Sequence, residues 1–424
     1  MGILSSLYSG VSGLAINGNA MSVIGNNIAN NNTIGFKTGR TLFSDLLSSS
    51  VSGSGGTSQV GRGVGLSQVD NIFSQGTFEN TELNTDLAIE GEGFFIVKDP
   101  IAGGDVYTRA GAFRFDSDGY LTNPEGFHVQ GYALNSAGIV SGDLTDIQVD
   151  TTSLSAPRAT QNLKLATNLD ADAPFVGPFD VADPGNTSNY ANSMNIYDSL
   201  GNAHLTTIYF TKMDPATNPL EWEWNATVDG AELGGAPGPV LIGTGNLLFD
   251  INGEMTAANP ATQPSIAGVL TWDNNSDQTQ LLNLAFNTTQ YSNASIVISQ
   301  SQDGFTTGSV ATLSIDNEGY VLGNYSNGQP RKLFQVAMAK FSNPGGLIKQ
   351  GNSMFSAGSH SGDAIVGTVG SGIGKIFTNA LEQSNVDLAQ EFVNMITTQR
   401  GFQASSKIIT TTDEMLSDLI NLKR

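Results

Sequence analysis

The sequence contains no cysteine, so it can form neither a disulfide nor a thiolate metal site. Charged residues are scarce too, at 13% of the chain against about a quarter in an average protein. Histidine occurs only at His128, His204 and His360, and none has a second histidine, a cysteine or a carboxylate at the spacing of metal ligands. We therefore expect no metal site.

Long apolar runs are absent as well. No stretch of about 18 apolar residues could span a bilayer, and the first residues lack the charged region and apolar core of a secretory signal peptide. The net charge of −21 repels nucleic-acid phosphates and anionic lipid headgroups. We expect no nucleic-acid partner and no membrane insertion, and any export must proceed without a cleaved signal peptide.

Catalytic signatures are also missing. The glycine-rich segments at 61–65 and 370–374 match neither G-x-G-x-x-G nor the P-loop, and no G-x-S-x-G nucleophile elbow occurs. Acidic residues are scattered singly over turns, so a paired-carboxylate glycosidase site has no positive support. These absences predict a protein that is not an enzyme, with no catalytic residue and no cofactor.

Turn-forming residues are abundant instead, with glycine at 50 of 424 positions. Together with Asn, Ser and Thr they predict short strands joined by tight turns in the middle of the chain. The clearest strand runs over 220–229, where Trp222 and Trp224 lie among apolar residues that alternate with polar ones. One face of this strand should be buried and the other wet.

Both ends of the chain are predicted to be helices. Residues recur there at steps of three and four, the spacing of a seam that faces another helix. The N-terminal seam consists of Leu4, Leu7, Val11, Leu14, Met21 and Ile28, and the C-terminal seam of Leu388, Phe392, Met395, Phe402, Ile409 and Leu416. Ser384 and Asp387 have the form of a capping box at the start of the second helix. Periodicity alone leaves open a coiled coil within one monomer or across a dimer.

A repeated turn indicates that the chain is nested. The sequence DSDGYL at 116–121 recurs as DNEGYV at 316–321, and both are hairpin signatures that flank an insertion. The predicted fold is mainly β with long terminal α-helices. Its predicted parts are a helical coiled-coil assembly domain (1–30 and 381–424), an extended linker (31–70 and 366–380), a discontinuous β-domain (71–150 and 295–365) and an inserted β-domain (151–294).

The run that follows the first helix, NNIANNNTIGFK at 26–37, resembles the signature shared by the rod and hook proteins of bacterial flagella. Its motif residues are Asn26, Asn27, Asn30, Thr33, Gly35, Phe36 and Lys37. Segments at 81–97, 107–113 and 116–121 resemble the next block of that family, and 384–424 resembles its C-terminal helix. Gly401 stands where the family more often carries Ala, and it should weaken the helix by about 1 kcal/mol.

The resemblance implies a structural subunit of the flagellar hook, which polymerises into a hollow flexible tube and passes torque from rod to filament. A distal rod protein of the same family is the alternative, but such proteins lack a large central insertion. A secreted β-rich adhesin would explain the composition and not the matched terminal helices.

The resemblance also implies where the parts and partners lie. The terminal helices are expected in the inner wall of the tube, with the β-domains outside. The main partner is the chain itself, and the distal rod protein, the hook cap protein, the hook-filament junction protein and the type III export apparatus are further ones. The location is extracellular, at the flagellar hook.

Overall fold

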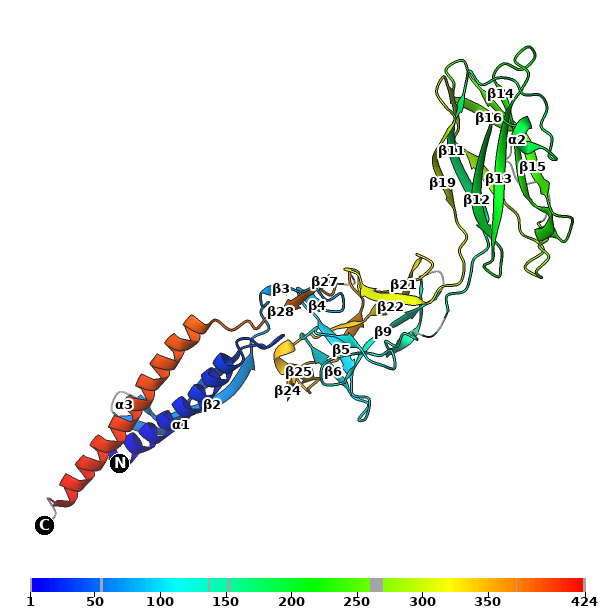
Figure 1. The fold of residues 1–424 in the computed structure, drawn as a ribbon. Coiled ribbons are helices and arrows are strands. Elements are labelled where there is room, and N and C mark those ends of the chain that lie inside the picture. Colours follow the sequence, from blue (N-terminus) through cyan, green and yellow to red (C-terminus); the bar gives the residue numbers. More distant parts are fainter. Residues whose placement is uncertain are drawn as a thin grey trace. The chain divides into compact units, whose positions relative to one another are not determined.

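A computed structural model describes residues 2–53, 56–135, 138–150, 152, 154–259, 270–370 and 372–421. The fold is mainly β with a long helix near each end, as predicted: α1 spans Gly2–Ala29 and α3 spans Leu388–Asn421 (Figure 1). The chain forms two compact units. The first contains residues 1–151, 312–324 and 330–424, and the second contains 152–311 and 325–329.

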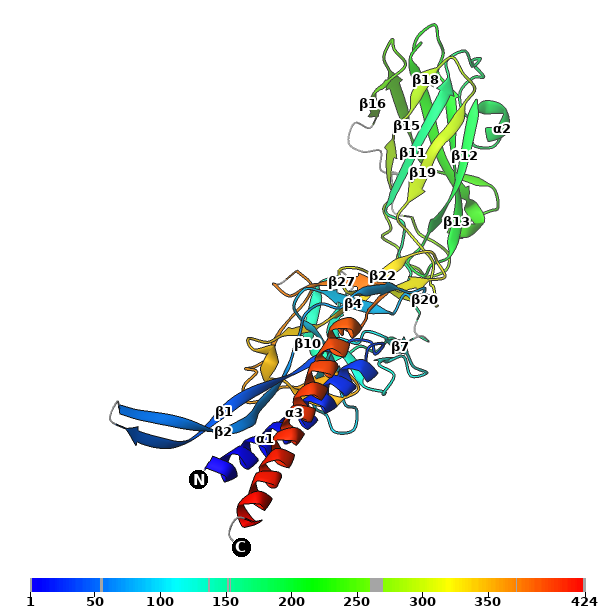
Figure 2. The same cartoon turned by 90° about the vertical axis from the view of Figure 1, so that its left-hand side faces the viewer.

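In the first unit, α1 and α3 lie side by side (Figures 1 and 2). Small residues let their backbones approach, since a Cβ added to Gly10 would lie 3.0 Å from Ile409 Cγ1. A Cβ added to Gly401 would lie 2.9 Å from Asn17 Oδ1. Gly401 is therefore more than the weak point of α3 that the sequence indicates, because it is also a point of close approach between the helices.

A long antiparallel hairpin follows α1. Strand β1 (Gly39–Gly53) pairs with β2 (Gly56–Asn71) from Gly39↔Asn71 to Gly53↔Gly56. The extended linker predicted for 31–70 is wrong here. Serine and glycine have little strand propensity of their own, so the hairpin depends on the pairing and on packing against α1, where Val64 N donates to Ser12 Oγ at 3.3 Å.

The β-region of the first unit is built from both flanks of the chain. Its main sheet runs in the order β20-β21-β22-β9-β5-β6-β25-β24. Strands β27 and β28 pair with β4 and β3, so 375–378 and 380 in the predicted linker (366–380) are paired, and so are 381–382 in the predicted helical domain (381–424). The bounds are β3 Phe78–Asn80, β4 Leu87–Glu90, β5 Phe94–Lys98, β6 Asp105–Thr108, β7 Arg114–Phe115, β8 Leu121–Thr122, β9 His128–Leu134, β10 Val140–Asp146, β20 Val310–Ile315, β21 Tyr320–Tyr325, β22 Pro330–Val336, β23 Met338–Lys340, β24 Ile348–Gly351, β25 Met354–Ser356, β26 Ile365–Gly367, β27 Lys375–Thr378 and β28 Ala380–Glu382.

The second unit packs a five-stranded antiparallel meander, β12 to β16, against a smaller sheet around β11. Trp222, Trp224 and Phe210 are fully buried in its core. The predicted wet face of β14 is only partly wet, because Asn225 and Thr227 are buried too. The bounds are β11 Asn162–Asp170, α2 Pro184–Thr187, β12 Tyr190–Tyr197, β13 Ala203–Lys212, β14 Glu221–Asp229, β15 Pro239–Phe249, β16 Met255–Asn259, β17 Asn283–Phe286, β18 Thr289–Tyr291 and β19 Ile296–Gln302.

Strand β19 belongs to the second unit and not to the flanking domain in which the sequence places it. It pairs antiparallel with β11, from Leu163↔Gln302 to Asn168↔Ile296. The unit therefore continues to residue 311, beyond the predicted end at 294. The returning strand of an insertion has the same composition as the strands that flank it, so composition could not locate this boundary.

Candidate functional site

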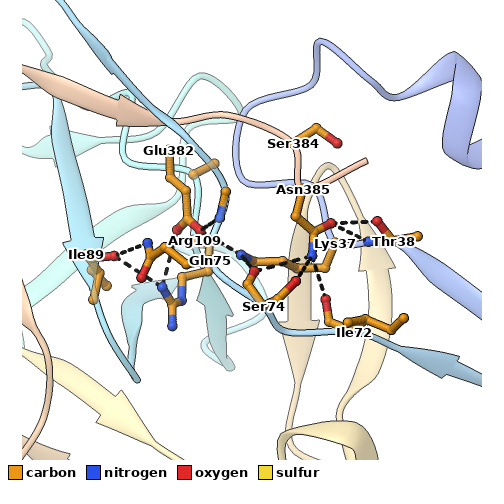
Figure 3. Close-up of polar contacts among 12 residues, drawn as sticks. Lys37, Thr38, Ile72, Ser74, Gln75, Ile89, Arg109, Glu382, Ser384 and Asn385 are labelled. Atoms are coloured by element: carbon orange, nitrogen blue, oxygen red, sulfur yellow. Dashed lines mark hydrogen bonds and ion pairs between the residues drawn. The ribbon is translucent and has the colours of Figure 1, made fainter. Parts of the chain in front are cut away.

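Three charged side chains from distant parts of the sequence meet in the first unit. Lys37, between α1 and β1, places Nζ 2.6 Å from Glu382 Oε1 at the end of β28 (Figure 3). Arg109, just after β6, donates from Nη1 to the other oxygen of Glu382 at 3.2 Å. Lys37 and Glu382 have side chains with no exposure, and that of Arg109 is 4% exposed. We call this cluster of Lys37, Arg109 and Glu382 the anchor.

The anchor holds two cations against one carboxylate, so main-chain carbonyls complete its hydrogen bonding. Lys37 Nζ donates to Ser74 O at 2.7 Å, and Arg109 Nη2 donates to Gly91 O at 2.6 Å. Burial lowers the pKa of both Lys37 and Arg109, although Glu382 acts to raise each. Such a group is costly to break, because each member left behind would be a buried charge without its partner.

Gly35 shows why a glycine belongs in the motif. Its φ is +68°, and an added Cβ would lie 2.5 Å from Ala110 N. The Gly35 amide donates to Glu382 O at 2.8 Å. Any side chain would push the chain away from the anchor, so the position requires glycine for its conformation and for its close contact.

Two asparagines bind the main chain around the anchor. Asn27 accepts from Gly39 N at 2.9 Å and donates to Gly39 O at 2.8 Å, which joins the end of α1 to the base of the hairpin. Asn385, before α3, accepts from Thr38 N at 2.8 Å and donates to Ile72 O at 2.8 Å (Figure 3). Both side chains thus satisfy main-chain groups that no strand partner reaches.

The start of α3 corrects the predicted capping box. The amides of Ala389 and Gln390 donate to Asp387 Oδ1 at 2.9 and 3.2 Å, so Asp387 is itself the N-cap. Ser384 Oγ accepts only from Val386 N, at 3.3 Å, outside the helix. A carboxylate in the cap position satisfies two first-turn amides, and Ser384 lies too early in the chain to reach them.

The N-terminal seam is not the face of α1 that the fold buries most deeply. Buried positions of α1 are Gly10, Ile16, Ala20, Ile24 and Asn27. Seam residues Leu7, Leu14, Met21 and Ile28 are half-buried and Val11 is exposed, while the side chain of Leu4 lies outside the described residues. Ile16, Ala20 and Ile24 lie four residues apart and form a second apolar stripe, and periodicity alone does not decide which of two such stripes is buried.

The C-terminal seam remains largely accessible. Leu388, Phe392 and Phe402 are exposed, the latter two by 51% and 40%, whereas Met395, Ile409 and Leu416 are half-buried. A groove of about 480 Å³ opens where α1, the hairpin base and α3 meet, with Ile24, Phe43 and Ile72 among the residues that line it. The helical end of the first unit thus presents exposed apolar side chains and a groove that both polar and apolar residues line.

Other chemistry has little support in the described part of the chain. No three His, Asp or Glu side chains gather there as a metal site would require, and no helix there is long and apolar enough to cross a membrane. His204 lies between Asp198 and Glu232 and stacks on Trp272 at 3.6 Å between ring centroids. Its two ring nitrogens contact different carboxylates, so His204 links Asp198 and Glu232 within the second unit.

Family models match the chain in four successive parts. Residues 7–37 match the flagella basal body rod protein model, and 88–165 match the D1 domain of flagellar hook protein FlgE/F/G. Residues 168–305 match the D2 domain of flagellar basal body protein FlaE, and 378–422 match the C-terminal model of flagellar basal body rod FlgEFG protein.

Curated relatives match the chain along its length. The flagellar hook protein FlgE of Borreliella burgdorferi is 38% identical over 99% of this chain and 100% of its own. The proteins of that name from Treponema pallidum and Salmonella typhimurium are each 34% identical, over 100% and 99% of this chain and all of their own lengths.

Proposed function

The chain belongs to the flagellar hook protein family and is a structural subunit of the hook, and we propose that its paired terminal helices are the part that packs against neighbouring copies. The observation that carries this proposal is the exposed apolar stripe of α3 that includes Phe392 and Phe402. Both residues lie on a helix that already has a partner in α1, so the fold of one copy leaves them uncovered.

Energetics favour this stripe as an assembly surface. Full burial of one large apolar side chain contributes about 1.5 to 3 kcal/mol, so a few such contacts per copy suffice for a polymer. In the proposed arrangement, the small-residue faces of α1 and α3 close the pair within a copy. The seam of Leu388, Phe392 and Phe402 then faces other copies in the inner wall of a hollow tube.

The remaining parts of the proposal rest on the family. The second unit and the β-region of the first form the outer wall, and the tube acts as a flexible joint that transmits torque from rod to filament. The chain acts outside the cell after export by the type III apparatus without a cleaved signal peptide, and it meets the distal rod, hook cap and hook-filament junction proteins. It needs no catalysis for this role, and we assign it no enzymatic activity.

The hook is favoured over the distal rod by the extent of the match. The relatives that cover 99% or more of the chain are named as hook proteins, and the match includes the central unit. A rod protein without that unit would match only the two flanks.

The decisive experiment separates assembly from folding. Phe402→Asp places a charge that must be desolvated in the assembled wall, at a cost of several kcal/mol per copy, whereas the exposed position makes it cheap in the monomer. We expect polymerisation, followed by electron microscopy and sedimentation, to be lost while the melting temperature of the monomer stays nearly constant.

Phe175→Asp is the matched control. Phe175 is 47% exposed in the second unit, so the substitution has the same chemistry at a similar exposure, and this variant should still polymerise. Normal tubes from Phe402→Asp, or a sharp fall in its melting temperature, would show that α3 is not an assembly element.

A further inference from the structure

A cavity of about 340 Å³ opens in the first unit where the end of α1 approaches β24 and β25. One wall comes from Asn26, Asn30, Thr33 and Phe36, and the other from residues 349–355. The motif at 26–37 is thereby divided in two. Its residues Asn27, Gly35 and Lys37 serve the packing around the anchor, and the other four line this cavity together with Lys37. Asn30 Nδ2 also donates to Asn26 O at 2.8 Å, and Thr33 Oγ1 donates to Asn30 Oδ1 at 3.1 Å.

The charge of the cavity is opposite to that of the chain. Acidic residues outnumber basic ones by 39 to 18, yet none lines the cavity, while Lys37 and Lys349 both do. Lys37 is neutralised by Glu382. Lys349 has no ion-pair partner among the described residues, and its ammonium lies 5.3 Å from the centroid of the Phe36 ring. Lys349 is exposed as a residue, and the desolvation that the surrounding chain still causes lowers its pKa.

The loop beside Lys349 is strained. Gly351, Asn352 and Ser353 have φ values of 90°, 51° and 56°, so two residues other than glycine lie in the left-handed region. Ser353 Oγ is buried without a hydrogen-bond partner in the described part of the chain. Backbone strain and an unused polar atom are features that concentrate where a protein receives a ligand.

We propose that this cavity binds a carboxylate side chain from a neighbouring copy in the polymer, with the Lys349 ammonium as its donor. The proposal rests on the assembly proposed above, because that assembly supplies the second copy. Carboxylates are the commonest ionic groups on such a neighbour, given its net charge of −21. Phe36, Met354 and Phe355 form apolar walls, and a carboxylate bound between them would accept a charge-assisted hydrogen bond from Lys349.

Carbodiimide coupling tests the contact directly, because it joins an amine to a carboxylate only when the two touch. A polymer assembled from equal amounts of ¹⁵N-labelled and unlabelled full-length chain should give mixed-label peptides in which Lys349 is coupled to Asp or Glu. Monomers treated at the same concentration should give none. A polymer without coupling at Lys349, or with coupling only within one chain, would overturn the proposal.

Substitutions measure the strength of the contact. Lys349→Gln should raise the concentration of free subunits at equilibrium with the polymer about tenfold or more, the loss expected for a charge-assisted hydrogen bond. Lys349→Arg should retain most of the affinity. Lys375→Gln is the matched control, since Lys375 is exposed on β27 and has no ion-pair partner in the described residues.

The outcomes separate this proposal from the assembly on which it rests. Polymers of Lys349→Gln that are as stable as those of the parent chain would overturn the carboxylate site and leave assembly by α3 intact. A parent chain that forms no polymer at all would overturn both.

Discussion

The second unit and the helical end of the first unit treat their large apolar side chains in opposite ways. In the second unit, Trp222, Trp224 and Phe210 are completely buried within one core. In the described part of α3, only Glu391 and Thr412 are buried, while Phe392 and Phe402 are exposed. One region therefore completes its apolar core within a single copy, whereas the other leaves large apolar side chains exposed, as the proposed assembly surface requires.

The helical end is joined to the β-region by polar groups in place of an apolar core. The anchor and the two asparagines connect α1, the hairpin and the segment before α3 through charge and main-chain hydrogen bonds. Such contacts are directional, so they fix the end of α1 and the start of α3 and leave the apolar faces of those helices free.

The largest effect on stability is expected in the closed core. Trp224→Ala should lower the free energy of unfolding of the second unit by about 5 kcal/mol, because it removes a fully buried ring and leaves a cavity. Denaturant unfolding of the full chain measures this. Phe402→Ala should cost less than about 1 kcal/mol in the same assay. Equal losses of unfolding free energy in the two variants would contradict the contrast between a closed core and an exposed helical surface.

The second-largest loss of stability is expected for substitutions in the anchor. Glu382→Gln leaves Lys37 and Arg109 buried without a counter-charge, and we expect a loss of about 4 kcal/mol in the stability of the first unit. Lys37→Met should cost less, because Arg109 and Glu382 remain paired. Denaturant unfolding monitored by helix content gives both values. The reverse order would mean that Lys37, and not the carboxylate, dominates the cluster.

A smaller, pH-dependent effect is expected in the second unit. Burial alone would raise the pKa of Asp198, but hydrogen bonds from Asn202, Asn274 and His204 outweigh it and lower the pKa from 3.8 to about 2. The stabilisation of about 2 kcal/mol is present in full above about pH 4 and is lost as pH falls through 2. Thermal unfolding across this range measures it, and Asp198→Asn should flatten the profile.

The smallest effect concerns the start of α3. Asp387→Ala removes the acceptor for two first-turn amides and should cost about 1 kcal/mol. Amide hydrogen exchange should be faster at Ala389 and Gln390 in this variant. The same exchange rates in Asp387→Ala and the parent chain would return the capping role to Ser384.

Much of the fold can be predicted from the sequence where the signal is local. The terminal helices follow from residues that recur at steps of three and four, and β14 follows from the alternation around Trp222 and Trp224. The hairpin over 39–71 could not be predicted in this way, because serine and glycine form strands only when a partner strand and α1 are in place.

The anchor shows which part of the candidate site cannot be predicted from the sequence. Lys37 and Gly35 belong to a recognisable motif, but Glu382 is a single acidic residue between Leu381 and Gln383, and nothing near it in the sequence identifies its partner. The one available signal is a charge inside a short buried strand, which indicates an ion pair without identifying the cation.

The anchor also constrains how the chain folds. Lys37 and Glu382 are 345 residues apart, so their pairing is among the most non-local contacts in the fold and carries a large loop-closure entropy. A chain that stops short of Glu382 has two cations to bury and no carboxylate to meet them. The junction therefore forms only in a chain that extends at least to Glu382.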